Sequence, residues 1–169
     1  MTTKRVLLTI LILAALTYVV FANSPTTIIP NEGIGQYKLN ISYTDLEKSV
    51  GKPDEITEVQ SDMALLIYDK DNIQVLLELN NSSENELRTR TLAIRTENPA
   101  HVFGKDKLHV GDTVTTLVKS MGEPDRIVKD GQLVQFIYEK QYVLSIVNNT
   151  ISGIIVWHTP QDNTNSESI

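Results

Sequence analysis

The chain has 169 residues, with 15 Lys or Arg, 21 Asp or Glu and no cysteine, and its formal net charge is −6. The lack of cysteine excludes disulfides, thiolate metal sites, a cysteine nucleophile and a lipid-modified N-terminal cysteine. The acidic balance argues against binding to nucleic-acid phosphates, and the length suits one ordinary domain or two very small ones.

The first 22 residues have the features of a membrane segment. Lys4 and Arg5 precede a run of 17 uncharged residues at 6–22. A basic start before an apolar run is typical of an export signal or an uncleaved anchor, and either one places the rest of the chain outside the cytoplasm. Both interpretations stay open, because Val20 and Ala22 suit cleavage after Ala22, whereas the run is at the short end of what spans a bilayer.

Two segments of biased composition flank the remainder. Residues 23–35 (NSPTTIIPNEGIG) are rich in Pro, Gly, Asn and Thr and are typical of a linker or an extended lead-in. Residues 161–169 (QDNTNSESI) are polar, so we expect a disordered tail.

An internal repeat lies between these segments, with one copy in residues 36–99 and the other in residues 100–160. Leu39 matches Leu108 at an offset of 69, and a Gly-x-Pro-Asp motif matches at an offset of 71. A two-residue insertion in the second copy accounts for the change of offset. The motif comprises Gly51, Pro53 and Asp54 in the first copy and Gly122, Pro124 and Asp125 in the second.

The repeated motif predicts the end of a helix in each copy. A glycine suits the positive φ of a helix C-cap, and the proline prevents the helix from continuing. The aspartates are then turn or capping residues. In the first copy Ser42 and Asp45 resemble a capping box. In the second copy Asp112 can cap a helix whose apolar residues recur with helical spacing over 114–121.

Strands are expected after each helix. The first copy offers 63–68 (MALLIY), 73–79 (IQVLLEL) and 87–94 (LRTRTLAI), and the second offers 133–138 (LVQFIY), 142–147 (YVLSIV) and 151–157 (ISGIIVW). The predicted fold class is therefore α+β, with two tandem repeats that follow an N-terminal apolar helix. In each repeat a short helix packs on a three- to four-stranded antiparallel sheet and covers one face of it. Residues 80–86 (NNSSENE) should form a loop.

The pattern of helix, Gly-x-Pro-Asp and meander resembles the small module of the SmpA/OmlA (BamE-like) envelope proteins. It is also similar to the tandem repeat of the β-lactamase inhibitor proteins and to modules found before CAP domains in Gram-positive secreted proteins. The resemblance covers about residues 35–160 and implies a non-enzymatic protein binder or scaffold. Since BamE-like proteins are lipoproteins and this chain has no cysteine to lipidate, the resemblance does not imply an outer-membrane assembly role. The matching residues are Leu39, Ile41, Leu46, Val50, Gly51, Pro53 and Asp54, and Leu108, Val110, Leu117, Met121, Gly122, Pro124 and Asp125.

The residues offer little catalytic chemistry. His101, His109 and His158 have no helical i, i+3 or i+4 spacing, so no metal site or cofactor is predicted. The turn at 69–72 lacks the Gly and the distal Glu of a calcium loop. We therefore expect a protein without enzymatic activity. A weak hydrolase or metal-dependent enzyme that uses His109 or His158 is the alternative.

The remaining hypothesis concerns a partner. Apolar residues lie on both faces of the predicted second sheet, so either the two repeats pack sheet against sheet or a free face binds something. The partner would be an unidentified envelope or extracellular protein, and inhibition of an extracellular enzyme through the loop at 80–86 is an alternative. Residues 32–99 hold 13 acidic and 7 basic residues, against 6 and 6 in residues 100–160, which fits either a basic partner or solubility alone. The candidate contact residues are Tyr68, Tyr138, Tyr142, Trp157, Leu133 and Ile137.

Overall fold

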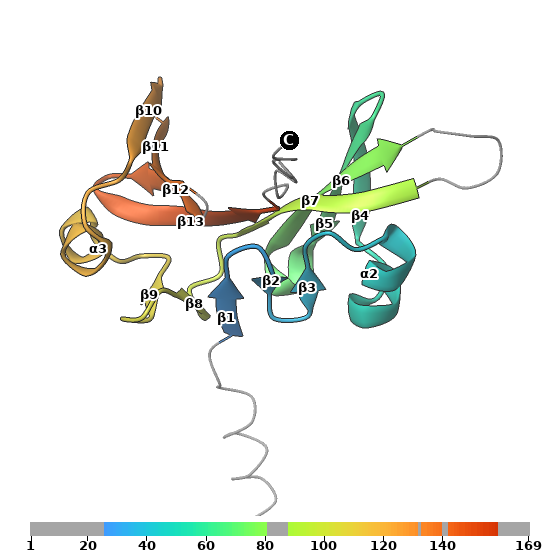
Figure 1. Ribbon diagram of the computed structural model, residues 1–169, viewed down its shortest axis with the longest axis horizontal. Helices are drawn as coiled ribbons and strands as arrows, with labels where there is room; N and C mark the ends of the chain where they lie inside the picture. Colours follow the sequence, from blue (N-terminus) through green and yellow to red (C-terminus); the bar gives the residue numbers. More distant parts are fainter. Residues whose placement is uncertain (1–25, 81–87, 132, 140–141, 159–169) are drawn as a thin grey trace, which may run out of the picture.

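The structure is a computed structural model that describes residues 26–80, 88–131, 133–139 and 142–158 (Figure 1). The predicted export signal or anchor at 1–22, the tail at 161–169 and residues 81–87 lie outside the described residues. Among the helices that are described, none has the length and apolar character needed to cross a membrane.

Strands dominate the described part of the chain. The helices are α2 (Tyr43–Val50) and α3 (Val114–Met121), and a 3₁₀ turn, η1, spans Asp69–Asp71. The strands up to residue 96 are β1 (Thr26–Ile29), β2 (Gly33–Ile34), β3 (Tyr37–Lys38), β4 (Glu55–Gln60), β5 (Met63–Tyr68), β6 (Ile73–Asn80) and β7 (Arg88–Thr96). The later strands are β8 (His101–Phe103), β9 (Leu108–His109), β10 (Arg126–Asp130), β11 (Leu133–Tyr138), β12 (Tyr142–Val147) and β13 (Thr150–Trp157).

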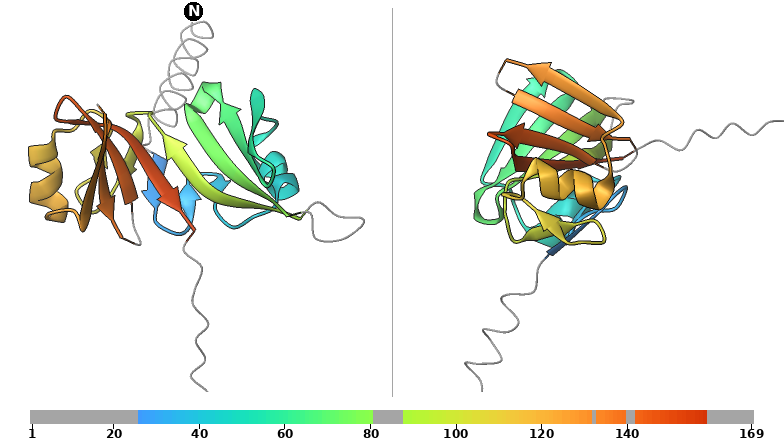
Figure 2. Two further views of the ribbon diagram at one scale, coloured as in Figure 1. Left: turned by 90° about the horizontal axis from the view of Figure 1, so that it is seen from above. Right: turned by 90° about the vertical axis from the view of Figure 1, so that its left-hand side faces the viewer.

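Eight strands form one large sheet in the order β10-β11-β12-β13-β7-β6-β5-β4. Every neighbouring pair in it is antiparallel. Four strands come from each sequence copy, and β7 and β13 join the two halves edge to edge. In Figure 2 the green strands of the first half and the orange-red strands of the second lie side by side in this sheet. The alternative in which the repeats pack sheet against sheet is therefore not what the structure shows.

The strand patterns explain which side chains point inward. Along β5 burial alternates strictly, with Ala64, Leu66 and Tyr68 buried and the residues between them half-buried. Such alternation follows from the pleat of a strand, in which successive side chains point to opposite faces. One face of the large sheet is therefore a core face.

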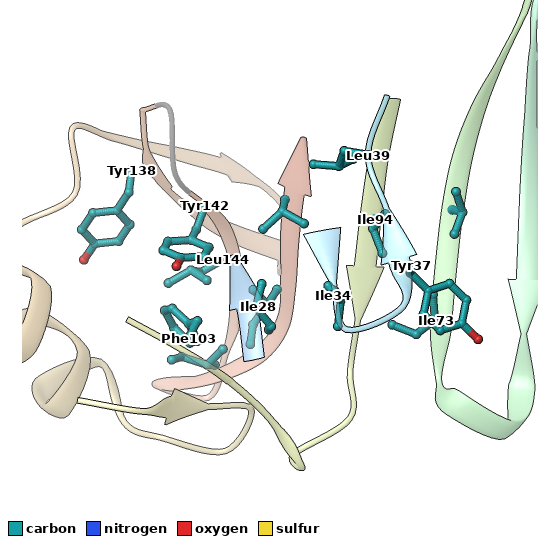
Figure 3. Packing of buried hydrophobic residues seen from close by; sticks show 14 of the residues in the cluster. Ile28, Ile34, Tyr37, Leu39, Ile73, Ile94, Phe103, Tyr138, Tyr142 and Leu144 are labelled. Carbon is teal, nitrogen blue, oxygen red and sulfur yellow. The ribbon is translucent and has the colours of Figure 1, made fainter. Parts of the chain in front are cut away.

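A smaller sheet covers the middle of this core face. Its order is β3-β2-β1-β8-β9, and β1 pairs with β8 in parallel. Ile28, Ile34 and Phe103 of the small sheet are at most 1% exposed, and they face Ile94 and Leu144 of the large sheet (Figure 3). Burial of these apolar side chains is the main favourable contribution to folding.

The predicted α+β class, with a helix covering the face of each sheet, is wrong. The protein is mostly β, and the short sheet built from residues before α2 and α3 covers the core face instead. Each helix has only eight residues and fully buries one side chain, Leu46 in α2 and Leu117 in α3. A helix this short cannot span a sheet. Beside α2 an apolar recess of about 380 Å³ remains open on the core side, and Ile56 in it is 58% exposed.

The ends of the helices follow the sequence signals in part. The hydroxyl of Ser42 accepts a hydrogen bond from the amide of Asp45 at 3.1 Å, as the capping box predicts. Thr113, and not Asp112, is the N-cap of α3. The carboxylate of Asp112 instead accepts from the amide of His109 at 2.9 Å.

The matched Gly-x-Pro-Asp motifs make matched contacts. Gly51 and Gly122 end the helices with φ of 87° and 82°, a region that favours glycine. The carboxylate of Asp54 accepts from the amide of Asp69 at 2.8 Å. That of Asp125 accepts from the amide of Glu139 at 2.7 Å. Asp54, just before β4, therefore holds the end of β5, with which β4 pairs. Asp125, just before β10, holds the end of β11 in the same way.

Tyr68 and Tyr138 occupy matching positions at the ends of β5 and β11 but differ in hydrogen bonding. The hydroxyl of Tyr138 donates to the carbonyl oxygen of Gly122 at 3.0 Å. The buried hydroxyl of Tyr68 has no partner within the described part of the chain. Burial raises the pKa of each phenol to about 12, so both are neutral at physiological pH.

We expect Tyr138→Phe to lower the free energy of unfolding by about 0.5–1.5 kcal/mol, because it removes a net-favourable hydrogen bond. Tyr68→Phe removes a hydroxyl that is buried without a partner, so it should leave stability unchanged or raise it. Urea unfolding of the two variants gives the comparison. Equal losses would contradict the difference in hydrogen bonding.

Candidate functional site

The face of the large sheet opposite the small sheet and the helices has no other described element against it, and we call it the open face. Figure 1 shows β10 and β11 rising at one end of the sheet and β4 and β5 at the other, with β7 and β13 crossing the middle. Cross-strand partners point to the same side of a sheet. The register therefore identifies the residues of the open face.

Two rows of cross-strand partners define the open face. One row crosses all eight strands through Glu55, Ile67, Gln74, Arg95, Ile155, Val143, Ile137 and Arg126. The second row runs through Thr57, Leu65, Leu76, Ala93 and Trp157. The interior of both rows is apolar apart from Gln74 and Arg95. The apolar area is thus continuous across the junction between the two halves.

Several large apolar side chains on this face are accessible. Leu133 is 40% exposed, Val147 is 43% exposed and Val128 is 38% exposed. They occupy the half of the sheet formed by β10, β11 and β12. Trp157 and Ile155 are half-buried in the middle. Large apolar side chains exposed together on one face are typical of an interaction site.

Two arginines near the middle of the open face, Arg90 and Arg95, are paired with carboxylates. The guanidinium of Arg95 donates to the amide oxygen of Gln74 at 3.2 Å and also contacts the carboxylate of Glu97. Gly153 lies beside it, where a Cβ would approach Nε of Arg95 to 3.4 Å. Arg90 forms an ion pair with Glu78 at 2.9 Å. A Cβ at Gly153 would therefore pack against the guanidinium of Arg95 at van der Waals distance.

The structure separates the candidate contact residues into two groups. Trp157, Leu133 and Ile137 lie on the open face, although Ile137 is only 9% exposed. The other three candidates lie on the core face and are buried: Tyr68, Tyr138 and Tyr142. Successive side chains of a strand point to opposite faces, so Tyr68, Tyr138 and Tyr142 lie on the face opposite to Ile67, Ile137 and Val143.

A polar cavity of about 420 Å³ lies between the small sheet, α2 and η1. In it the hydroxyl of Tyr37 donates to the carboxylate of Asp71 at 2.6 Å. His101 lines the same cavity, is 7% exposed, and shares a hydrogen bond of 2.7 Å between Nδ1 and the hydroxyl of Thr96. Burial lowers the pKa of His101 below its ordinary value of 6.5, and the charge of Asp71 opposes this shift in part.

The lowered pKa of His101 predicts a loss of stability in acid. The unfolded chain binds a proton near the ordinary pKa of 6.5, whereas the folded chain binds it only at lower pH, so stability falls as the pH drops below that value. Urea unfolding at about pH 7.5 and about pH 5 should show a smaller loss for His101→Gln than for the original chain. Equal losses in the two proteins would refute the assignment.

The other histidines lie apart from one another in the fold. Nδ1 of His109 contacts the carbonyl oxygen of Val110 at 2.9 Å on β9. His158 follows β13, and its amide donates to the carbonyl oxygen of Leu92. Among the described residues no group of three or more His, Asp or Glu side chains is arranged to hold a metal ion.

Comparison with known proteins gives the fold class alone. No protein-family model matches the sequence, and no curated protein does. The SmpA/OmlA and β-lactamase inhibitor repeats expected from the sequence are therefore not shown for this chain.

Two solved structures are similar to this one. The first is a DUF4309 family protein (YjgB) from Bacillus subtilis subsp. subtilis str. 168, at 13% identity, a TM-score of 0.53 and coverage of 76% of this chain and 88% of that chain. The second is an extracellular protein containing an SCP domain from Bacillus anthracis str. Ames, at 9% identity, a TM-score of 0.44 and coverage of 71% and 44%. At its identity the first likeness shows a shared fold.

Proposed function

We propose that the chain is an exported, non-enzymatic module that binds another envelope or extracellular protein on its open face. The observation that carries the proposal is the continuous apolar surface over both halves of the large sheet, centred on Ile155 and Trp157. A sheet of this kind needs only one covered face to be stable, and here the small sheet and the helices cover the other. The open face is thus available for a partner.

The electrostatics of the open face favour a protein partner. Its central arginines, Arg90 and Arg95, are already paired with carboxylates, whereas Arg126 lies apart on the edge strand β10. It therefore offers no array of free cations for phosphate groups, in keeping with the net charge of −6. An apolar centre surrounded by paired charges is the usual composition of a protein–protein interface.

Trp157 is the residue from which we expect the largest contribution to binding. Tryptophan is enriched among residues that dominate interface energies, and central positions contribute most. Trp157 pairs with Ala93 at the junction of β7 and β13, so its ring has a small neighbour across the strand. A partner side chain can therefore contact the indole directly.

Substitution of the open face tests the proposal. The full chain, tagged and cross-linked in envelope membranes, should capture a partner that Trp157→Ala binds about tenfold more weakly. Leu133→Glu should abolish capture because it places a charge in the apolar surface. The matched control is Ile29→Glu, since Ile29 is 39% exposed on β1 and Leu133 is 40% exposed.

Far-UV circular dichroism and thermal unfolding of each variant establish that the fold is kept. If Leu133→Glu and Ile29→Glu capture the partner equally, the open face is not the binding site. The inhibitor alternative depends on the loop at 80–86, which, Asn80 apart, lies outside the described residues.

A further inference from the structure

The strand β10 is one edge of the large sheet, and no described strand lies on its outer side. All five of its residues are exposed, including Ile127 at 48% and Val128 at 38%. An edge strand presents unpaired backbone N–H and C=O groups and can add another strand. With apolar side chains exposed beside these groups, β10 has the properties of an interaction surface.

The charges of β10 form a pattern that is complementary to itself. The strand reads Arg-Ile-Val-Lys-Asp over 126–130. Arg126, Val128 and Asp130 lie on the open face, opposite Ile137, Gln135 and Leu133 of β11. Within the described ranges neither Arg126 nor Asp130 has an ion pair. The strand therefore begins with a free cation and ends with a free anion on the same face.

From this pattern we infer that β10 pairs with β10 of a second copy, antiparallel, about a two-fold axis through Val128. Each Arg126 then lies opposite Asp130 of the other copy, and the two Val128 side chains meet at the axis. On the core side Ile127 lies opposite Lys129. Directly opposed unlike charges stabilise such pairs, and an isologous contact of this kind closes as a dimer.

Neighbouring registers fit less well. Centring the pair on Lys129 places two lysines opposite each other, which is destabilising. Centring it on Ile127 would pair Lys129 with Asp125, whose carboxylate already accepts the amide of Glu139 at 2.7 Å. The axis through Val128 is the register that uses charges left free by the fold.

The other edge does not share this property. β4 carries Glu55 and Glu58 and no basic residue, so two copies of it would repel. Its pairing with β5 also shifts register between Glu58 and Gln60. Such an irregularity protects an edge from further pairing. The two edges are therefore distinct, and β10 is the one suited to a second copy.

The contact is short, so we expect a reversible dimer. Five residues a side bury less than the about 1,200–2,000 Å² of a stable interface. Covalent trapping is the appropriate measurement, and the lack of cysteine in the chain makes any introduced thiol unique. Cα atoms of opposed antiparallel residues are about 4.5–5.5 Å apart, which a disulfide can bridge.

The test is oxidation of the full chain carrying Val128→Cys, read on a non-reducing gel. We expect a disulfide-linked dimer, and little from Thr57→Cys, the matched control in the middle of β4 on the open face. Dominant cross-linking by Ile127→Cys, or a mixed dimer between the Val128→Cys and Thr57→Cys chains, would overturn the proposed pairing. So would failure of Val128→Cys to cross-link while circular dichroism shows it folded.

Charge reversal tests the register in the same Val128→Cys background. Arg126→Asp or Asp130→Arg alone places like charges opposite each other twice and should reduce the cross-linked fraction about fivefold or more. The double reversal restores unlike pairs and should restore cross-linking. A double variant as poor as the single ones would refute the pairing.

Discussion

The strand β7 is the element through which the other parts of the fold are connected. One edge of it pairs with β6 and the other with β13 over residues 93–96. A bulge between Leu76 and Leu77 separates that pairing from Thr91, whose backbone N–H and C=O bond to the backbone of Ile41 and Asn40 at 2.9 Å. The hydroxyl of Thr91 donates to the carbonyl oxygen of Lys38 as well. A completely buried threonine therefore ties the segment leading into α2 to the large sheet.

The same arrangement recurs on β13. The backbone of Ile151 bonds to Gly111 and Asp112, just before α3, as Thr91 bonds to residues before α2. Since β7 and β13 are the paired central strands, both helices are attached to the middle of the sheet through the segments that precede them. The small sheet is built from those segments and is held against the core face for the same reason. Closure of the core face leaves the open face as the remaining large apolar surface of the sheet.

Local features of the sequence predicted much of this structure. The helix caps at Ser42, Gly51 and Gly122 and the strands at 63–68, 133–138 and 142–147 agree with the structure. Each depends on a signal within about ten residues: a capping side chain, a glycine, or alternating burial. The edge strands β4 and β10 were missed because all of their residues are exposed, so no alternation distinguishes them from loops.

The small sheet could not be predicted, and the fold class was wrong for that reason. Its strands have two to four residues, and the parallel pair joins Thr26 to His101 across 75 positions. No local pattern specifies such a contact. The free face was inferred from the apolar residues on both sides of the second sheet, but placing Tyr68, Tyr138 and Tyr142 on it was wrong. Alternation divides the residues of a strand between two faces and does not say which face the small sheet covers.

The position of β1 has a consequence for orientation. The described part of the chain begins at Thr26, in β1, which is the central strand of the small sheet. The small sheet is the layer on the opposite side of the large sheet from the open face (Figure 1). In a protein tethered by residues just before Thr26, the small sheet would face the bilayer and Trp157 would point into the surrounding aqueous space. Two sheet layers, about 10 Å apart, would then lie between the point of attachment and the apolar surface.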